Sequence, residues 1–267
     1  MKISVIGGGV MGEIITRSIL NQQIAKPSEM MVVDINASKR RILKKKYLVA
    51  TSKSALKAVF NSEVVIICLK PQGSNQVLTA LKGKIKSDAL VISIMAGIRL
   101  ASLEKWLGHR NIVRSMPNIS SRIGEGMTVW FANKNVQTLH LLLAQMIFQS
   151  FGKELRAIDE NLIDSATAVS GSGPAYIFYI AEKLIKASID LGFDAKESLK
   201  LIRQTFQGAM DLWDETALSP KTLREMVTSE KGTTDAAIKT FERLKAGEVL
   251  TKGVQAAFKR AKELANE

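Results

Sequence analysis

A short polar stretch between two helical patterns contains residue types that suit the binding of an anion. The stretch reads TSEKGTTDAAI (228–238) and places Ser229, Gly232, Thr233 and Thr234 directly ahead of an alanine-rich run. Glycine frees the backbone, hydroxyls donate hydrogen bonds, and the first N–H groups of a helix have no acceptor within it. Together these groups suit a carboxylate or a phosphate. The same residues also suit an ordinary helix cap, and the stretch alone leaves both interpretations open.

A glycine-rich segment near the N-terminus, VIGGGVMG (5–12), has the G-x-G-x-x-G spacing of a dinucleotide-binding loop. It directly follows an apolar strand pattern and opens a helical one. In that context Gly7 permits a tight turn, Gly9 lets a pyrophosphate approach the backbone, and Gly12 lets helix and strand pack closely. The alternative is a turn that is tight for packing only. We expect a site for NADH or NADPH, with its phosphates at the helix N-terminus. The expected cofactor-binding residues of this loop are Gly7, Gly9, Val10, Met11 and Gly12.

The end of the second strand pattern bears on the choice of cofactor. Asp34 stands there, and an acid at this point can accept hydrogen bonds from the ribose hydroxyls of NAD. Asn36, Lys39 and Arg40 follow at once, and such donors and cations suit the 2′-phosphate of NADP. A third interpretation is that Asp34 points into the sheet. The sequence leaves the choice between NADH and NADPH open.

The segment CLKPQ (68–72) follows the fourth strand pattern. Ligands of open parallel sheets bind outside the carboxyl ends of the strands, so Lys70 and Pro71 are expected near the cofactor crevice. Pro71 stiffens the turn. The alternative for Lys70 is an exposed lysine at a strand end.

These segments need a parallel sheet to position them. The first half alternates short runs rich in Val and Ile with amphipathic helical stretches, as expected for strands buried on both faces. We therefore predict an α/β fold whose residues 1–158 form a doubly wound, Rossmann-type dinucleotide-binding domain. The strands are expected at 2–6, 30–35, 47–50, 64–69, 89–94, 111–116 and 127–132, with a last short strand in FGKELRAID.

From residue 159 onward the periodicity is almost wholly helical. Residues 159–267 are predicted to form a helical substrate and dimerisation domain, because their broad apolar faces need a second subunit to cover them. Within it, VSGSGPAYIF (169–178) predicts a helix break, with Ser172 as a cap and Pro174 in the first turn of the next helix. Gly192 and Gly247 are expected just after helix ends.

The composition excludes several kinds of site. The chain has one cysteine, Cys68, so an intrachain disulfide is impossible, and two histidines, too few for a Cys/His zinc site. No apolar run approaches the ~20 residues of a membrane span, and the N-terminus does not resemble a signal peptide. The net charge is +13, but apart from KRRILKKK (39–46) the basic residues are scattered. We expect a cytoplasmic protein without a bound metal and without nucleic acid or membrane as partner.

Taken together, the motifs resemble those of one family, pyrroline-5-carboxylate reductase. They occur in the family's order through nearly the whole chain, and the combination is far more specific than the glycine loop. The matching segments are VIGGGVMG (5–12), LKPQ (69–72), SIMAGI (93–98), RSMPN (114–118), SGSGPAY (170–176), LREMVTS (223–229) and GTT (232–234).

The resemblance implies an enzyme that reduces L-1-pyrroline-5-carboxylate to L-proline with NADH or NADPH. It implies a homodimer with interlocked helical domains, often assembled into a ring of dimers. The loop at 5–12 would bind pyrophosphate, and Lys70 and Pro71 would line the crevice. Ser229, Gly232, Thr233 and Thr234 would form the substrate pocket, with the Thr234 hydroxyl hydrogen-bonded to the ring nitrogen.

The chain departs from the family pattern within this pocket. Glu230 and Lys231 stand where the family usually has proline and glycine, and a residue other than glycine makes a positive φ at position 231 costly. Two alternatives therefore remain. One is a related imine or short-chain acid reductase with an altered substrate. The other is a non-catalytic nucleotide-binding protein whose basic surface binds a partner.

Overall fold

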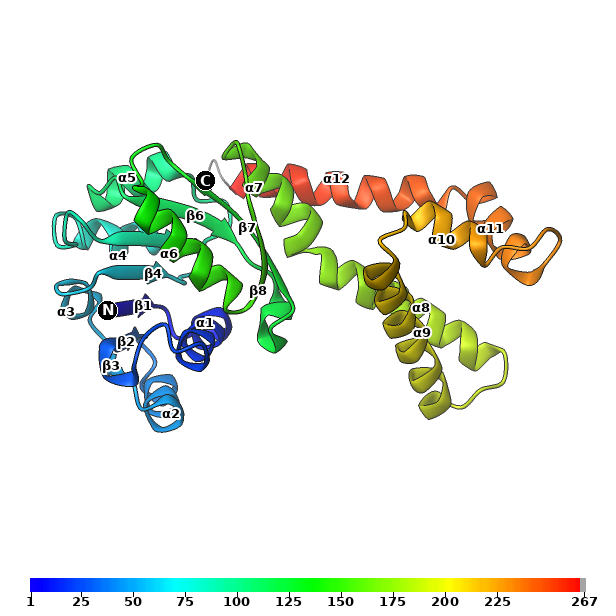
Figure 1. Ribbon diagram of the computed structural model, residues 1–267, viewed down its shortest axis with the longest axis horizontal. Coiled ribbons are helices and arrows are strands. Elements are labelled where there is room, and N and C mark those ends of the chain that lie inside the picture. Colours follow the sequence, from blue (N-terminus) through cyan, green and yellow to red (C-terminus); the bar gives the residue numbers. More distant parts are fainter. Residues whose placement is uncertain (265–267) are drawn as a thin grey trace. The chain divides into compact units, whose positions relative to one another are not determined.

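An eight-stranded sheet organises the N-terminal part of the chain (Figure 1). Its order is β3-β2-β1-β4-β5-β6-β7-β8, and all neighbours are parallel except β6 and β7. The computed structural model describes residues 1–264. The strands are β1 (Ile3–Ile6), β2 (Met30–Val33), β3 (Ala50–Ser52), β4 (Val64–Ile67), β5 (Leu90–Ser93), β6 (Ile112–Met116), β7 (Gly126–Ala132) and β8 (Gly152–Arg156).

Helices cover both faces of this sheet, as the strand–helix alternation predicted. Asn36 and Ser54 begin two of them by accepting hydrogen bonds from backbone N–H groups of the first turn. The helices are α1 (Val10–Asn21), α2 (Ala37–Tyr47), α3 (Ala55–Val59), α4 (Ser74–Ala80), α5 (Leu100–Leu107), α6 (Thr138–Gln149) and α7 (Asn161–Ala166), with the 3-10 turns η1 (Pro27–Glu29) and η2 (Ile119–Ile123) and the π-helical turn η3 (Thr167–Gly171).

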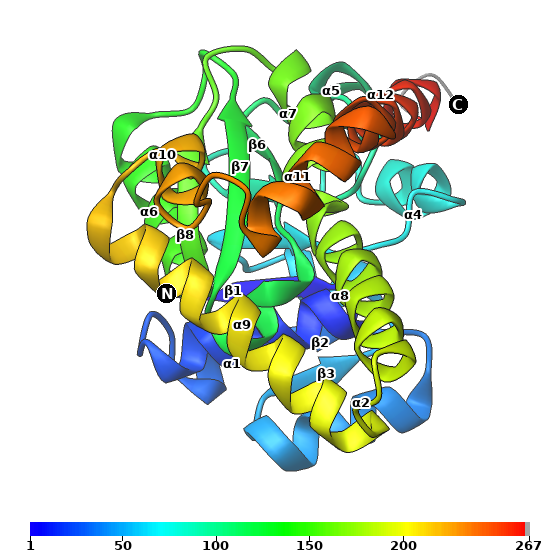
Figure 2. The same cartoon turned by 90° about the vertical axis from the view of Figure 1, so that its right-hand side faces the viewer.

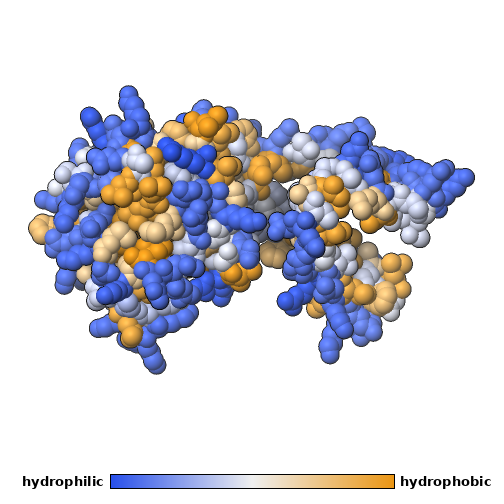
Figure 3. Space-filling view, in the orientation of Figure 1, coloured by the Kyte–Doolittle hydropathy of each residue, from blue (hydrophilic) through white to orange (hydrophobic). Residues whose placement is uncertain are grey.

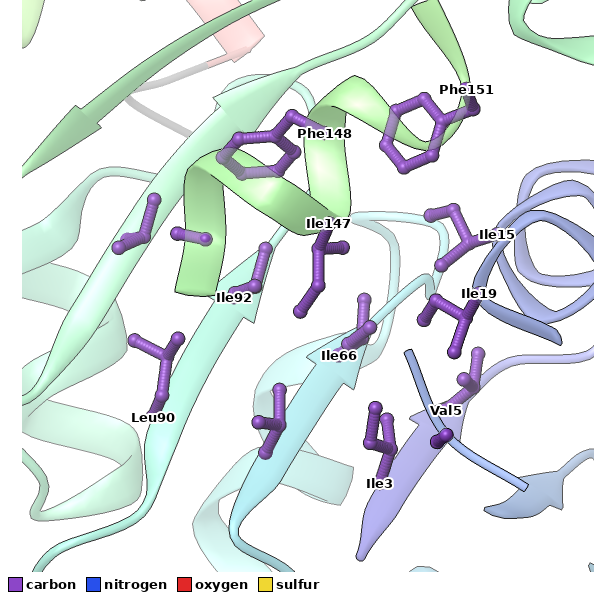
Figure 4. Close-up of a cluster of buried hydrophobic side chains, with 14 of the residues drawn as sticks. Ile3, Val5, Ile15, Ile19, Ile66, Leu90, Ile92, Ile147, Phe148 and Phe151 are labelled. Carbon is purple, nitrogen blue, oxygen red and sulfur yellow. The ribbon is translucent and has the colours of Figure 1, made fainter. Parts of the chain in front are cut away.

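The core has one layer on each face of the sheet. Figure 4 shows the first layer, where Ile3 and Ile66 lie opposite Ile15 of α1 and Ile147 of α6. The second layer sets the alternate strand residues against α3, α4 and α5. The central strands β1, β4 and β5 are buried along their whole length, which explains their uninterrupted apolar sequence.

Two sequence predictions were wrong in detail. The strand expected at 47–50 lies at Ala50–Ser52, because α2 continues to Tyr47 and Leu48 ends it with φ +58. The strand expected at 127–132 is confirmed as β7, and it runs antiparallel to β6, a direction that a strand pattern alone does not encode. Gly247 lies in the first turn of a helix, because the preceding helix ends earlier and Lys245 turns the chain with φ +57.

The chain divides into two compact units, and each is described separately. The first contains residues 1–172 together with the chain from Ala257 onward, and the second contains Gly173–Ala256. The predicted domain boundary near residue 158 is a functional division and stays a prediction. The compact units divide later in the chain, so that α7 and η3 belong to the first unit. The helices of the second unit are α8 (Gly173–Asp190), α9 (Ala195–Thr216), α10 (Pro220–Met226), α11 (Thr233–Arg243) and the first part of α12 (Ala246–Leu264).

The second unit is built around the pair α8 and α9, which lie side by side in Figures 1 and 2. Gly192 turns the chain between them with φ +108. Asp194 then starts α9 in a capping box with Glu197. The unit buries few side chains of its own, and Figure 3 shows apolar side chains on the surface of its helices.

Candidate active site

The glycine loop lies where the strand order reverses. Since β1 has β2 on one side and β4 on the other, the β1–β4 junction is the position at which open sheets of this type bind a ligand, outside the carboxyl ends of the strands. Gly7 makes the turn with φ +112 and donates its N–H to the Val33 carbonyl at 2.8 Å. A Cβ at Gly7 would lie 2.5 Å from the Cys68 carbonyl oxygen, so the loops after β1 and β4 are in close contact.

The other two glycines have the geometry that a dinucleotide requires. A Cβ at Gly9 would meet nothing within 4 Å, so this side of the loop is open to a ligand. A Cβ at Gly12 would lie only 1.9 Å from the Gly7 carbonyl oxygen, which makes glycine obligatory there for packing. The N–H groups of Val10, Met11 and Gly12 open the 12-residue helix α1 without an intrahelical acceptor. The residues therefore fit a pyrophosphate.

The carboxylate of Asp34 is engaged by the protein itself. Its Oδ2 accepts a hydrogen bond from the Gly8 N–H at 3.1 Å, and its Oδ1 accepts one from the Asn36 N–H at 2.8 Å. Lys39 approaches the same carboxylate at 3.8 Å. Arg40 donates to the Asp34 and Ile35 carbonyls. The acid is thus used to shape the turn between β2 and α2.

Lys70 and Pro71 follow β4 at the same edge of the sheet. Lys70 is exposed, and the Pro71 carbonyl accepts hydrogen bonds from the Ser74 N–H and hydroxyl at 3.1 and 2.8 Å. The turn is therefore pinned at its proline. Burial raises the pKa of the nearby Cys68 thiol, which consequently stays protonated near neutral pH and is a poor nucleophile.

The segment that follows β6 contacts the π-helical turn η3, and this contact was not predicted from the sequence. Asn118 donates from its amide nitrogen to the Ser170 carbonyl at 3.1 Å, and its Oδ1 accepts from the N–H groups of Ser120 and Met127. A Cβ at Gly171 would lie 2.9 Å from Cε of Met116. The MPN and SGSG segments are thus in contact. Only their joint presence in one family pattern hinted at this.

The expected helix break at 169–178 is a change of helix type. The chain passes from α7 through the π-helical turn Thr167–Gly171 and bends at Ser172 before α8 starts. Ser172 does not cap the next helix; its hydroxyl and N–H both donate back to the Thr167 carbonyl at 3.0 and 2.9 Å. The extra residue of a π turn has no signature in the periodicity, and such turns are frequent at functional sites.

The predicted substrate residues gather in one turn of the second unit. Gly232 is the N-cap of α11, and its own N–H donates to the Ser229 carbonyl at 3.0 Å. The N–H groups of Thr233 and Thr234 have no acceptor in the helix. Within residues 1–264 no hydrogen bond occupies the hydroxyls of Ser229, Thr233 or Thr234. Thr234 is half-buried and Ser229 is exposed. The turn therefore offers several free donors to an anion.

Lys231, one of the two residues that depart from the family pattern, adopts φ +60, the left-handed conformation that glycine adopts most cheaply. Its N–H donates to Asp235 Oδ2 at 3.1 Å and is therefore not available to a ligand. The Lys239 ammonium, 2.7 Å from the same oxygen, holds the pKa of Asp235 below its usual value. The anionic Asp235 thus occupies one donor of the turn.

The structure brings the predicted residues together in two groups. In the first unit, the glycine loop, Asn36, Lys70 and Pro71 share one edge of the sheet. In the second unit, the four predicted substrate residues share the N-terminus of α11. Among residues 1–264, no cluster of three or more His, Cys, Asp or Glu side chains is placed to hold a metal ion, and none of the helices is long and apolar enough to cross a membrane.

Comparison with known proteins decides the family. Residues 160–264 match the family model described as pyrroline-5-carboxylate reductase dimerisation, and residues 2–97 match that of NADP oxidoreductase, coenzyme F420-dependent. A pyrroline-5-carboxylate reductase of Synechocystis is 36% identical over 264 residues, covering 99% of this chain and 98% of the relative. The chain belongs to the pyrroline-5-carboxylate reductase family.

Solved structures of this family have the same fold. A pyrroline-5-carboxylate reductase from Coxiella burnetii superposes with a TM-score of 0.91 at 36% identity and covers 99% of this chain and 98% of its own. One from Plasmodium falciparum, solved with NADP bound, has a TM-score of 0.89 at 28% identity, with coverages of 99% and 98%. The predicted family, Rossmann-type fold and oxidoreductase class are confirmed.

Proposed function

We propose that this protein reduces L-1-pyrroline-5-carboxylate to L-proline with NAD(P)H, the last step of proline biosynthesis. One observation carries the proposal: a chain that is similar to reductases of this name over its full length presents both an open dinucleotide loop and a turn of free donors. An isolated glycine loop would support many activities, whereas this combination supports one.

The residues divide the work between cofactor and substrate. The N–H groups of Val10, Met11 and Gly12 bind the pyrophosphate, and Lys70 and Pro71 line the crevice beside it. When bound, the nicotinamide supplies the hydride, so the protein contributes mainly by positioning. The remaining predicted cofactor residue is Asn36, in the turn after β2, which would hold the adenosine ribose.

The turn at α11 holds the substrate. Its carboxylate binds the N–H groups of Thr233 and Thr234, assisted by the Ser229 hydroxyl, and Gly232 lets it approach the backbone. The Thr234 hydroxyl hydrogen-bonds the ring nitrogen, whose basicity rises as the imine is reduced. Because a cyclic imine is electrophilic once protonated, one hydroxyl and good alignment suffice, and no histidine is needed.

The geometry of Asp34 favours NADPH over NADH. Each oxygen of Asp34 already accepts one backbone hydrogen bond and Lys39 approaches the carboxylate at 3.8 Å, so only part of its accepting capacity and charge is left for the ribose diol of NADH. Lys39 and Arg40 lie in the same turn and supply positive charge for a 2′-phosphate. Ile35, which is 91% exposed, offers an apolar surface to the adenine ring.

The helical region completes the proposal. We place the functional division near residue 158, supported by the dimerisation match at 160–264, and propose a homodimer formed through these helices. Assembly into a ring of dimers and a cytoplasmic location remain predictions that mass measurement and fractionation test.

An activity assay with two cofactors tests the function. Purified full-length protein is expected to oxidise NADPH in the presence of pyrroline-5-carboxylate, with a higher kcat/KM than for NADH. Absence of oxidation above background, with cofactor binding shown independently, would disprove the reductase. Faster oxidation with another cyclic imine would assign a different substrate.

The Thr234 hydroxyl is tested by Thr234→Ala. The rate is expected to fall by roughly one to two powers of ten, since a single proton-transfer group is lost. Thr240→Ala in the same helix is the matched control, because its hydroxyl donates only to the Ala236 carbonyl. Equal kcat and KM for Thr234→Ala and wild type would remove this hydroxyl from the mechanism.

A further inference from the structure

A cluster of charges with a buried centre joins β6, α7 and the start of α5, and β5 separates it from the β1–β4 junction where the cofactor is proposed to bind. Arg114 of β6 is 0% exposed, and its guanidinium donates to Asp164 of α7 at 2.5 Å and to Glu160 at 2.9 Å. Arg99, at the start of α5, contacts the other oxygen of Asp164 at 3.4 Å. We name these four residues the Arg114 cluster. Asp164 is 1% exposed, so the pair it forms with Arg114 is removed from water.

Stability alone does not account for this pair. Burying an arginine and a carboxylate costs desolvation energy that the mutual attraction offsets only with complete hydrogen bonding, and well-packed apolar residues often serve as well. Here Nε of Arg114 finds no partner among residues 1–264. Around the cluster, α7 already packs apolar residues such as Ile163 and Ala166 against β6 and β7.

The Arg114 cluster ties three segments at the carboxyl edge of the sheet. Glu160 accepts from the Leu100 N–H at 2.8 Å, and Arg99 donates to Asn161 at 3.1 Å, so the end of the SIMAGI loop is joined to α7. Arg114 joins α7 to β6. Since α7 continues directly into η3, the cluster also sets where the π-helical turn begins.

We propose that the Arg114–Asp164 pair is a positioning device for the reduction. It holds α7, and through it the π-helical turn and the SIMAGI loop, in one register. Neither residue touches substrate or cofactor in this role. An ion pair suits it, because directional hydrogen bonds define a register that apolar contacts leave free to slip. The inference rests on the proposed reductase function.

A double variant separates positioning from stability. Arg114→Met and Asp164→Leu are each expected to lower the Tm, because one buried charge loses its partner. The combined variant is expected to regain most of that stability, while its kcat/KM stays about 10- to 100-fold below wild type, the usual cost of a small misplacement. The Kd for NADPH is expected to be unchanged, since the glycine loop is not touched. Arg114→Lys should not retain the wild-type kcat/KM, because lysine lacks the planar guanidinium group that donates two parallel hydrogen bonds to a carboxylate.

The matched control is Leu107→Ala, a buried substitution at the C-terminal end of α5. It should lower the Tm without lowering kcat/KM. The proposal is overturned if the combined variant regains kcat/KM together with stability, or if Leu107→Ala loses as much activity at equal stability.

A second measurement does not depend on catalysis. Amide hydrogen exchange of Thr167–Gly171 should be faster in the combined variant and in the milder Asp164→Asn, which serves if the combined variant does not fold. Unchanged exchange overturns the inference. If the wild-type chain fails to reduce pyrroline-5-carboxylate, the proposed function fails, whereas the exchange result still decides the role of the Arg114 cluster.

Discussion

The two compact units differ in how they obtain a core. In the first, β1, β4 and β5 are buried along their length and helices cover both faces of the sheet. In the second, α8, α10 and α11 bury no residue fully, and α9 buries only Ser198. Large apolar side chains remain exposed there, among them Phe178 at 65% and Leu191 at 82%.

A single chain is enough to bury the apolar residues of the first unit but not the apolar helix faces of the second. Helices with such apolar faces are not stable in water unless something covers them. The family model matched by residues 160–264 is named for dimerisation, which supports the proposal that a second copy of the chain covers these faces. Stability should therefore depend on protein concentration for the helical unit and not for the sheet unit.

The largest effect is expected from a charge placed on the helical surface. Phe178→Glu in α8 should weaken the dimer by at least about 2 kcal/mol, as loss of a central apolar contact does. Light scattering after size exclusion would then show monomer at concentrations where wild type is dimeric. Leu139→Glu in α6 is the control, since Leu139 is 73% exposed on the sheet unit. If Leu139→Glu dissociated the dimer and Phe178→Glu did not, the contact between subunits would lie on the sheet unit and not on the helical unit.

An intermediate effect is expected from two glycines of the cofactor loop. Gly12→Ala should cost about 2–3 kcal/mol at any protein concentration, because its methyl group meets the Gly7 carbonyl oxygen at 1.9 Å. Gly9→Ala should change stability by less than about 0.5 kcal/mol, since its methyl group meets nothing. It should nevertheless weaken NADPH binding by filling the space for pyrophosphate. Chemical denaturation measures the stability of each variant, and titration with NADPH measures its affinity. Equal destabilisation by Gly12→Ala and Gly9→Ala would contradict the packing role of Gly12 and the ligand-binding role of Gly9.

The smallest effect is a pH dependence that belongs to the sheet unit. Burial lowers the pKa of His109 from its ordinary value of 6.5, although a hydrogen bond to the Ala89 carbonyl opposes the shift. The unfolded chain therefore binds a proton more readily than the folded one. Stability is full above pH 6.5 and declines as the pH falls from 6.5 toward the lowered folded value.

His109→Gln removes this titration. The decline of the Tm on acidification through that window should be shallower for the variant than for wild type. An identical decline in both proteins would show that other groups are responsible.

Local patterns were enough for the elements and the glycine loop. Alternation of apolar runs with helical periodicity predicted the strands, and the G-x-G-x-x-G spacing after a strand predicted the turn that Gly7 makes. The boundaries were less accurate where a helix end needs a left-handed residue other than glycine, as at Leu48 and Lys245. Such ends are decided by packing and leave no mark in composition.

Contacts between distant segments could not be predicted in this way. Nothing in the sequence around Asp34 shows that its carboxylate would bind the Gly8 N–H, or that Arg114 would meet a carboxylate 50 positions further on. The π-helical turn and the antiparallel pairing of β6 with β7 are of the same kind. Each depends on which segments the completed sheet brings side by side.

The fold class and the family followed from the sequence, and two groups of site residues were predicted from it, because periodicity and motifs are local in the chain. How those residues are held became visible only in the folded structure. It showed that Asp34 shapes its own loop, that the Thr234 turn gives up one donor to Asp235, and that charged side chains link β6, α7 and the SIMAGI loop. The physical reason is that hydrogen bonds and ion pairs act over a few ångströms, so their partners are set by the fold and not by neighbourhood along the chain.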